Sequence, residues 1–202
     1  YWLPPYLAQF HAAYPMLDLR LTLGNTESVT QATEAGLADI GLVEGAVQAP
    51  ALSLRKVGTD QLIVVTGPDH PWRNAEKLTW DSLFSGQWIL REHGSGTRSV
   101  FEDAARVAGY DPARLNIALE LPSNEAICSA VLSGNYVTAI SELVAASHLA
   151  AGTLVKANFA LPQRQFLMLS HNDRYQTKAL TSFANMLIRE PDMSRTEQLL
   201  DQ

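Results

Sequence analysis

Residues 17–43 read LDLRLTLGNTESVTQATEAGLADIGLV, and the pattern of this segment predicts an α/β fold. The four leucines of residues 17–23 alternate with polar residues, which predicts a strand of period two. The turn at residues 24–26 leads into a helix that we expect to end at Gly36. Residues 39–43 are a short apolar run that predicts a buried strand. Strand, helix and strand in this order predict a right-handed crossover in a largely parallel sheet.

The same alternation extends outward in both directions. Before it, apolar residues at helical spacing predict a helix that ends at Tyr14-Pro15. The chain opens at Tyr1 without Met or a recognisable signal peptide, so we expect it to begin at a helix whose preceding elements are missing. After it, we expect strands at 62–65, 88–90, 115–121, 136–140 and 166–169, and helices at 101–108, 123–133, 141–151 and 180–188.

The breaker-rich segment at residues 67–71 interrupts this pattern, which then restarts. We therefore predict an α/β protein of two Rossmann-like lobes joined by two crossover strands. Lobe I would hold residues 1–65 plus 163–190, lobe II residues 66–162, and residues 191–202 a polar tail. The hinges are expected near Val65-Thr66 and near residues 163–165.

Composition limits the function classes. Hydrophobic residues make up 47% of the chain and charged residues 18%, enough for a proper core. No apolar run approaches the roughly 18 residues of a membrane span, so we expect a soluble domain. The net charge is −6 and the 15 basic residues are scattered, which argues against nucleic-acid binding by this piece. The single cysteine, Cys128, is interpreted as a buried structural thiol, with a redox sensor or nucleophile as the alternative.

Polar and glycine-rich turns follow the expected strands. Open α/β sheets bind ligands beyond the carboxyl ends of their strands, where helix N-termini favour small anions. The candidate ligand-binding residues are Asn25, Thr26, Glu44, Glu92, His93, Gly94, Ser95, Gly96, Thr97, Arg98, Ser123, Asn124 and Ser141. Several of them are equally plausible helix caps, and only their convergence on one edge predicts a cleft.

The segment from Arg91 to Arg98 is the strongest local signal. Its glycines allow close backbone approach, Ser95 and Thr97 supply donors, and Arg98 can bring a positive charge to the cleft. The alternative for Arg98 is a solvated helix residue. The segment is neither a nucleotide P-loop nor a hydrolase elbow, because it lacks the required spacings.

The sequence gives little support for an enzymatic function. The five histidines have no metal-ligand spacing, so we expect no metal and no cofactor. His93 beside Ser95 is adjacency in a turn and not a triad, and the role of His93 stays open. We therefore expect no catalysis.

The order of several segments resembles the effector-binding domain of LysR-type transcriptional regulators. The matching segments are Tyr1-Trp2-Leu3-Pro4-Pro5-Tyr6-Leu7, Gly36-Leu37-Ala38-Asp39-Ile40-Gly41-Leu42-Val43, Asp69-His70-Pro71, Trp88-Ile89-Leu90-Arg91-Glu92, Gly94-Ser95-Gly96-Thr97-Arg98 and Ser123-Asn124-Glu125-Ala126-Ile127. The resemblance runs from Tyr1 to about Ile188. It is greatest to a branch that includes regulators of sulfur assimilation and carbon fixation, which implies a small anionic effector.

The resemblance implies a periplasmic-binding-protein-like (type 2) fold with the effector between its lobes. It implies contacts from Asn25, Thr26, Glu44, residues 94–98, Ser123, Asn124 and Ser141. It also implies a cytoplasmic protein that is a homodimer through this domain and a tetramer at full length. DNA would be bound only through an N-terminal helix-turn-helix domain absent here, and the family's first strand and turn are missing too. The helix at residues 25–35 and the strand at residues 39–43 are expected in the pairing, unless their apolar positions are ordinary core.

Two other functions stay open at this point. A solute-binding protein of a transport system uses the same two-lobed architecture, and a metabolic enzyme on this fold is a more distant alternative.

Overall fold

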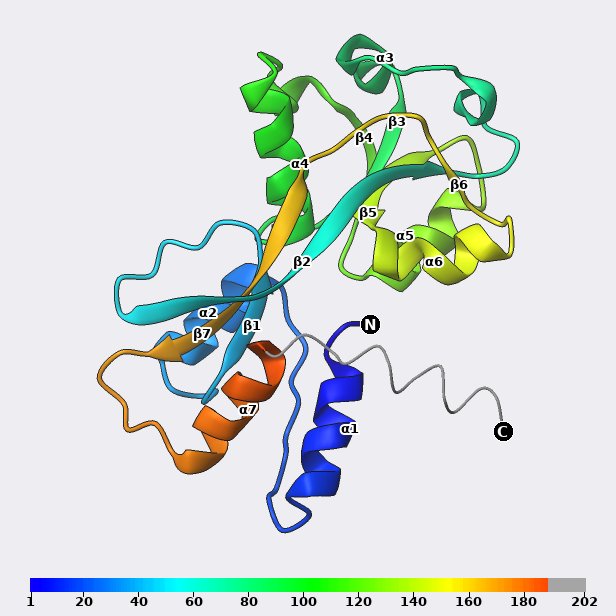
Figure 1. Cartoon of the computed structure of the whole chain (residues 1–202). Coiled ribbons are helices and arrows are strands. Elements are labelled where there is room, and N and C mark those ends of the chain that lie inside the picture. Colours follow the sequence, from blue (N-terminus) through cyan, green and yellow to red (C-terminus); the bar gives the residue numbers. More distant parts are fainter. Residues whose placement is uncertain (189–202) are drawn as a thin grey trace, which may run out of the picture.

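The computed structural model describes residues 1–188, which form two lobes around a sheet that continues from one lobe into the other (Figure 1). Seven strands lie in the order β1-β7-β2-β5-β3-β4, with β6 paired to β2. The strands are β1 (Gly41–Glu44), β2 (Leu52–Thr66), β3 (Gln87–Arg91), β4 (Asn116–Leu121), β5 (Val137–Ser141), β6 (Val155–Lys156) and β7 (Gln163–His171). The helices are α1 (Pro4–Ala13), α2 (Thr26–Glu34), α3 (Trp80–Phe84), α4 (Gly96–Val107), α5 (Asn124–Val131), α6 (Glu142–Ala150) and α7 (Lys178–Ile188), with 3-10 turns η1 (Pro71–Asn74) and η2 (Pro112–Arg114).

Strand β2 connects the lobes. It pairs with β7 from Leu52 to Gln61 and with β5 from Leu62 to Thr66. The change of partner lies four residues before the predicted hinge near Val65-Thr66, while β7 begins at Gln163, within the second predicted hinge. We therefore propose the same two lobes, with the first boundary at the change of partner between Gln61 and Leu62. Residues 189–190 of the predicted lobe I and the predicted tail lie outside the described residues.

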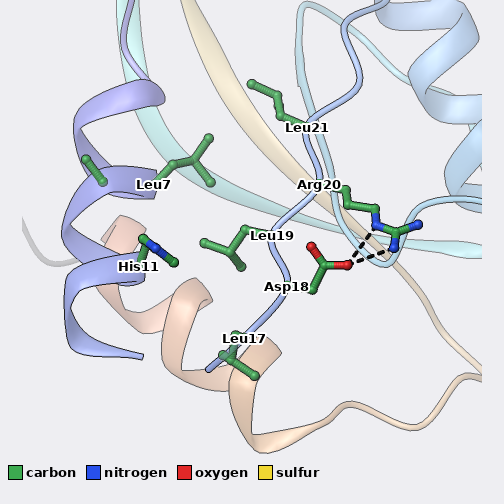
Figure 2. A pocket seen from close by; sticks show the side chains of 8 residues that line it. Leu7, His11, Leu17, Asp18, Leu19, Arg20 and Leu21 are labelled. Carbon is green, nitrogen blue, oxygen red and sulfur yellow. Dashed lines mark hydrogen bonds and ion pairs between the residues drawn. The ribbon is translucent and has the colours of Figure 1, made fainter. Parts of the chain in front are cut away.

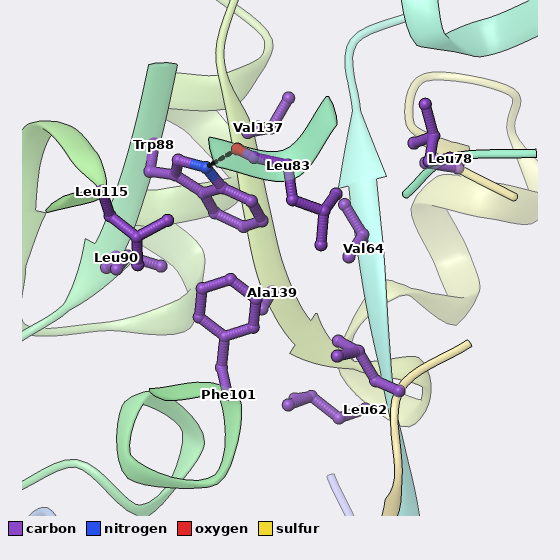
Figure 3. Close-up of a cluster of buried hydrophobic side chains, with 12 residues drawn as sticks. Leu62, Val64, Leu78, Leu83, Trp88, Leu90, Phe101, Leu115, Val137 and Ala139 are labelled. Atoms are coloured by element: carbon purple, nitrogen blue, oxygen red, sulfur yellow. Dashed lines mark hydrogen bonds between the residues drawn. The ribbon is translucent and has the colours of Figure 1, made fainter. Parts of the chain in front are cut away.

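Lobe II has a core on each face of its sheet because β2 carries a continuous apolar run. Leu62 and Val64 face α3 and α4, whereas Ile63 and Val65 face α5 and α6. Such runs are typical of strands buried on both faces. Figure 3 shows the first cluster, in which the rings of Trp88 and Phe101 lie 4.5 Å apart between centroids. The indole Nε1–H of Trp88 donates to the carbonyl of Leu83 at 2.7 Å, which satisfies the one polar atom of that side chain.

Lobe I is smaller, and its main core lies between the sheet and helices α1 and α7. Phe10 of α1 meets Phe183 of α7 with ring centroids 5.0 Å apart. Val57 and Met168 complete the buried cluster from the sheet side. Helix α2 covers the opposite face, and Val43 and Leu169 belong to the smaller cluster there.

Two sequence predictions about strands are wrong. The pairings are mostly antiparallel, and only β3 with β4 and β3 with β5 are parallel. The reason is that β2 runs antiparallel to its neighbours in both lobes, and β7 runs antiparallel to both β1 and β2 in lobe I. Residues 17–23 form no strand, because no described strand pairs with their backbone, and Leu19, Leu21 and Leu23 are left exposed.

Candidate functional site

A cavity of about 270 Å³ lies between the two lobes and takes its wall from both. Its lining residues are Tyr1, Trp2, Leu3, Leu23, Gly24, Asn25, Thr26, Leu42, Val43, Glu44, Arg91, Ser95, Gly96, Asn124, Ser141, Leu143, Val144, Arg164 and Phe166. The walls are apolar around a few polar groups, as in small-molecule sites generally. Five helices, α1, α2, α4, α5 and α6, begin at or beside this cavity.

Arg164 of β7 is the central cation of the site. Its side chain is 2% exposed, and its Nε and Nη2 donate to Asp60 Oδ2 at 2.8 and 2.7 Å. Asp60 is the register partner of Arg164 on β2, so this pair bridges the crossing strands. Ser141 Oγ donates to the second oxygen of Asp60 at 2.9 Å. The carboxylate of Asp60 is thus satisfied without water, as buried charges require.

Glu44, at the end of β1, is the second carboxylate on Arg164. Its Oε2 lies 2.7 Å from Arg164 Nη2, and its Oε1 accepts from Thr97 Oγ1 at 3.2 Å. Thr97 Oγ1 also accepts from Arg164 Nη1 at 2.8 Å. A residue of lobe II, Thr97, is therefore hydrogen-bonded to two residues of lobe I.

The N-terminus of α4 lies against the end of β1. A Cβ at Gly96 would overlap the carbonyl oxygen of Glu44, so only glycine allows this approach. Ser95, the N-cap, is 3% exposed and lines the cavity, yet its side chain makes no capping hydrogen bond. By contrast, Asn25, Ser123 and Ser141 cap their own helices by accepting from backbone N–H groups. The first turn of α4 therefore keeps donors and a partial positive charge beside the cavity.

Arg91 supplies a further cation to the wall. Its Nε donates to Glu92 Oε2 at 2.8 Å, its Nη2 to Glu92 Oε1 at 3.0 Å, and its Nη1 to Asn124 Oδ1 at 3.2 Å. Burial alone would raise the pKa of Glu92, but hydrogen bonds from Arg91 and Asn25 and the charge of Arg91 bring it below its ordinary value. Glu92 is therefore ionised and neutralises Arg91.

The two lobes touch at one side of the cavity. Asn25 Nδ2 donates to Glu92 Oε1 at 3.1 Å, and the backbone N–H of Glu27 donates to the carbonyl of Gly94 at 3.2 Å. Gly94 has φ +84°, and a Cβ there would overlap the carboxylate of Glu27. These contacts hold the lobes in one relative orientation.

Most of the predicted site residues meet at the cavity. Asn25, Thr26, Glu44, Ser95, Gly96, Asn124 and Ser141 line it, and Glu92 and Thr97 are hydrogen-bonded to residues that do. Gly94 is hydrogen-bonded to Glu27, which does not line the cavity. Arg98, His93 and Ser123 do not line it.

Arg98 needs a correction. Its guanidinium turns away from the cavity, where Nε donates to Glu102 at 2.7 Å and Nη1 to Glu120 and to the carbonyl of Arg91 at 3.1 Å. Position 98 is the third residue of α4, and its side chain lies against β3 and β4 rather than on the cavity face. The alternative of a solvated residue also fails, because Arg98 is buried.

His93 and Ser123 are the other two predicted site residues that do not line the cavity. His93 is exposed, with Nε2 3.8 Å from Glu120 Oε2. Ser123 uses its hydroxyl to accept from the N–H of Ala126, which makes it the cap of α5. Neither side chain is left facing a ligand.

Sequence reasoning missed Arg164, Asp60 and Arg91 as candidate contacts. Arg91 opens the turn already singled out, so its position was available. Asp60 and Arg164 are 104 residues apart, and only the strand register brings them together. The one signal was that an acid, Asp60, stands near the first expected crossing and a base, Arg164, stands at the second.

A second hollow, of about 400 Å³, lies between α1 and the extended residues 17–21 (Figure 2). Leu7, Leu17, Leu19 and Leu21 give it an apolar wall. Its charged members, Asp18 and Arg20, pair with each other at 2.8 Å and are exposed. It lacks the buried polar groups that distinguish the cavity between the lobes.

Within residues 1–188, no group of three His, Cys, Asp or Glu residues could hold a metal ion. Nor does any helix in that range have the length and apolarity to cross a membrane. Cys128 is buried on α5, and burial raises the pKa of its thiol, which suits the interpretation as a structural residue.

Comparison with known proteins agrees with this architecture. The family model described as LysR substrate binding domain matches residues 1–192. The chain is 32% identical to the uncharacterized HTH-type transcriptional regulator YeiE of Escherichia coli K12 over 91% of this chain and 62% of that protein. It is 31% identical to the HTH-type transcriptional regulator CysL of Bacillus subtilis over 71% of this chain and 47% of that protein. The chain thus spans about half to three fifths of the length of these relatives.

Solved structures show the same fold. The Synechocystis PCC6803 CcmR regulatory domain in complex with 2-PG superposes with a TM-score of 0.82 at 23% identity, covering 92% of this chain and 89% of that one. The effector binding domain of QuiR in complex with shikimate gives a TM-score of 0.79 at 16% identity, covering 93% and 88%. At these identities the likeness concerns the fold alone.

Proposed function

The chain belongs to the LysR substrate binding domain family, and from this premise we propose that it senses a small anionic effector in the cavity between its lobes. The full-length protein would be a cytoplasmic transcriptional regulator whose DNA binding or activation responds to that effector. The carrying observation is the first turn of α4, whose N-cap residue Ser95 is buried, lines the cavity and leaves its hydroxyl without a capping hydrogen bond.

The size and position of the cavity support a small metabolite. About 270 Å³ is near the lower end of the range of small-molecule sites, which suits a small metabolite. The CcmR domain was solved with 2-PG and the QuiR domain with shikimate, and both of these occupy domains of the same fold.

The wall also suggests how binding acts at a distance. A ligand that touches Ser95 of lobe II and Thr26 or Glu44 of lobe I has a different affinity for each relative orientation of the lobes. Only such differential affinity can shift a two-state equilibrium. We propose that this rearrangement passes to the DNA-binding part through a homodimer of this domain within a tetramer, with α2 and β1 in the pairing surface.

The relatives favour a regulator over a solute-binding protein, because YeiE and CysL are both HTH-type regulators. We propose no catalysis, because both relatives are HTH-type transcriptional regulators.

Calorimetry after a thermal-shift screen of small anions and carboxylates tests the proposal. A ligand of the native state raises the melting temperature by mass action. Thr97→Ala should weaken the best ligand about tenfold, through loss of its bonds to Glu44 and Arg164. If no anion or carboxylate in the screen stabilised the domain, the proposal of an anionic effector would fail.

A further inference from the structure

The charges around Arg164 do not balance. One guanidinium faces two carboxylates, Asp60 and Glu44, so this half of the wall carries a net charge of −1. Asp60 is 1% exposed and fully engaged, whereas Glu44 is 25% exposed and lines the cavity. The excess negative charge therefore faces the ligand.

Glu44 is also fixed in place. Thr26 Oγ1 donates to its backbone carbonyl at 2.9 Å, Thr97 Oγ1 to its Oε1 at 3.2 Å, and Arg164 holds its Oε2. A carboxylate offers about four acceptor positions, and these contacts use two of them. Glu44 lines the cavity, so this unused acceptor capacity is available to a ligand there.

Hydrogen-bond donors lie on another part of the same cavity wall. The first turn of α4, with the Ser95 hydroxyl, offers donors to the same cavity, whereas the charge of Arg91 is neutralised by Glu92. A ligand held here meets hydrogen-bond donors on one part of the wall and the carboxylate acceptor of Glu44 on another.

We propose that Glu44 is a specificity-determining residue that accepts a hydrogen bond from the effector. The site then selects an anion that carries a hydroxyl, an ammonium group or an acidic proton, and rejects an anion of the same shape without one. A fully ionised anion would place its lone pairs against those of Glu44, which costs affinity because neither side can donate. This inference rests on the proposed function, whose effector it narrows.

Matched probes test it by calorimetry at neutral pH. Phosphate retains a proton that sulfate lacks, and glycolate carries a hydroxyl that acetate lacks. If either member of a pair binds, wild-type protein should bind the donor-bearing member at least about tenfold more tightly. This is the size expected for one charge-assisted hydrogen bond.

Glu44→Gln should reduce that preference to within about twofold, because the amide can donate as well as accept. Glu102→Gln is the matched control: Glu102 is another partly buried glutamate paired with an arginine, but it does not line the cavity. This control should keep the wild-type preference. If Glu44→Gln does not fold, the preference measured on the wild-type protein tests the proposal by itself.

Two failures are distinguishable. Equal wild-type affinity for both members of a binding pair, or a Glu44→Gln variant that keeps the tenfold preference, overturns the role of Glu44 and leaves the proposed function intact. Absence of binding by all four probes counts against the anionic effector itself, and this inference falls with it.

Discussion

Two buried arginines of this domain have similar surroundings and different consequences. Arg164 lies between Asp60 and Glu44, and Arg98 lies between Glu102 and Glu120. Arg164 opens onto the cavity between the lobes, whereas Arg98 ties α4 to β4 and holds the carbonyl of Arg91. Burial and ion pairing therefore do not identify a binding residue by themselves. What separates the two is whether one of the carboxylates is left with unused acceptors facing a cavity.

The largest expected effect is on stability at Arg164. Arg164→Met leaves Asp60 buried without a cation, and breaking such a pair costs about 3–5 kcal/mol. Urea denaturation measures the loss, and Asp60→Asn combined with Arg164→Met should recover part of it. A loss of less than about 1 kcal/mol would contradict the claim that Arg164 is needed to neutralise the buried Asp60.

Arg98→Met should cost less, about 1–2 kcal/mol, because Glu120 is 41% exposed and solvent screens its pair. Effector affinity should stay within about threefold of wild type, since the side chain turns away from the cavity. A tenfold loss of affinity with unchanged folding would show that Arg98 contributes to effector binding after all.

Ser95→Ala should affect binding and leave stability nearly unchanged. Its hydroxyl caps nothing, so unfolding should change by less than about 0.5 kcal/mol, while affinity for an anion falls about three- to tenfold. Ser99→Ala, one turn further along α4, is the control, because its hydroxyl donates to the carbonyl of Gly96 at 3.1 Å. Equal binding losses in the two variants would sink the assignment of Ser95.

The smallest effect concerns pH. The hydrogen bond from Arg98 lowers the pKa of Glu120 below its ordinary value in the folded state. Stability from this pair is therefore present above the unfolded pKa of about 4.3 and is lost as the pH falls through the folded pKa. Glu120→Gln should cost under about 1 kcal/mol at neutral pH and nothing in acid, measured by urea midpoints. A cost that grows on acidification would reverse the assigned sign.

Local signals in the sequence predict most of the elements. Asn25 and Gly36 bound α2 as expected, because a cap and a left-handed glycine act within a few residues. The alternating leucines of residues 17–23 mislead for the opposite reason. Period two shows that a segment can be a strand, but a strand exists only where a neighbour supplies backbone partners.

The site was predictable in part for the same reason. Turns at strand ends converge in any open α/β sheet, so Ser95, Gly96 and Asn124 could be expected there. The pairing of Asp60 with Arg164 depends on the register of two distant strands, which no local pattern encodes. The direction of Arg98 depends on how α4 is rotated against β3 and β4, and that is set by packing around Phe101.

The central claim is that an effector sits between the lobes and touches both. A crystal structure of the domain with the tightest-binding of the four probe anions tests it most directly. We expect density in the cavity within hydrogen-bond distance of Ser95 in lobe II and of Glu44 or Thr26 in lobe I. Density confined to the hollow beside α1, or to one lobe alone, would contradict it.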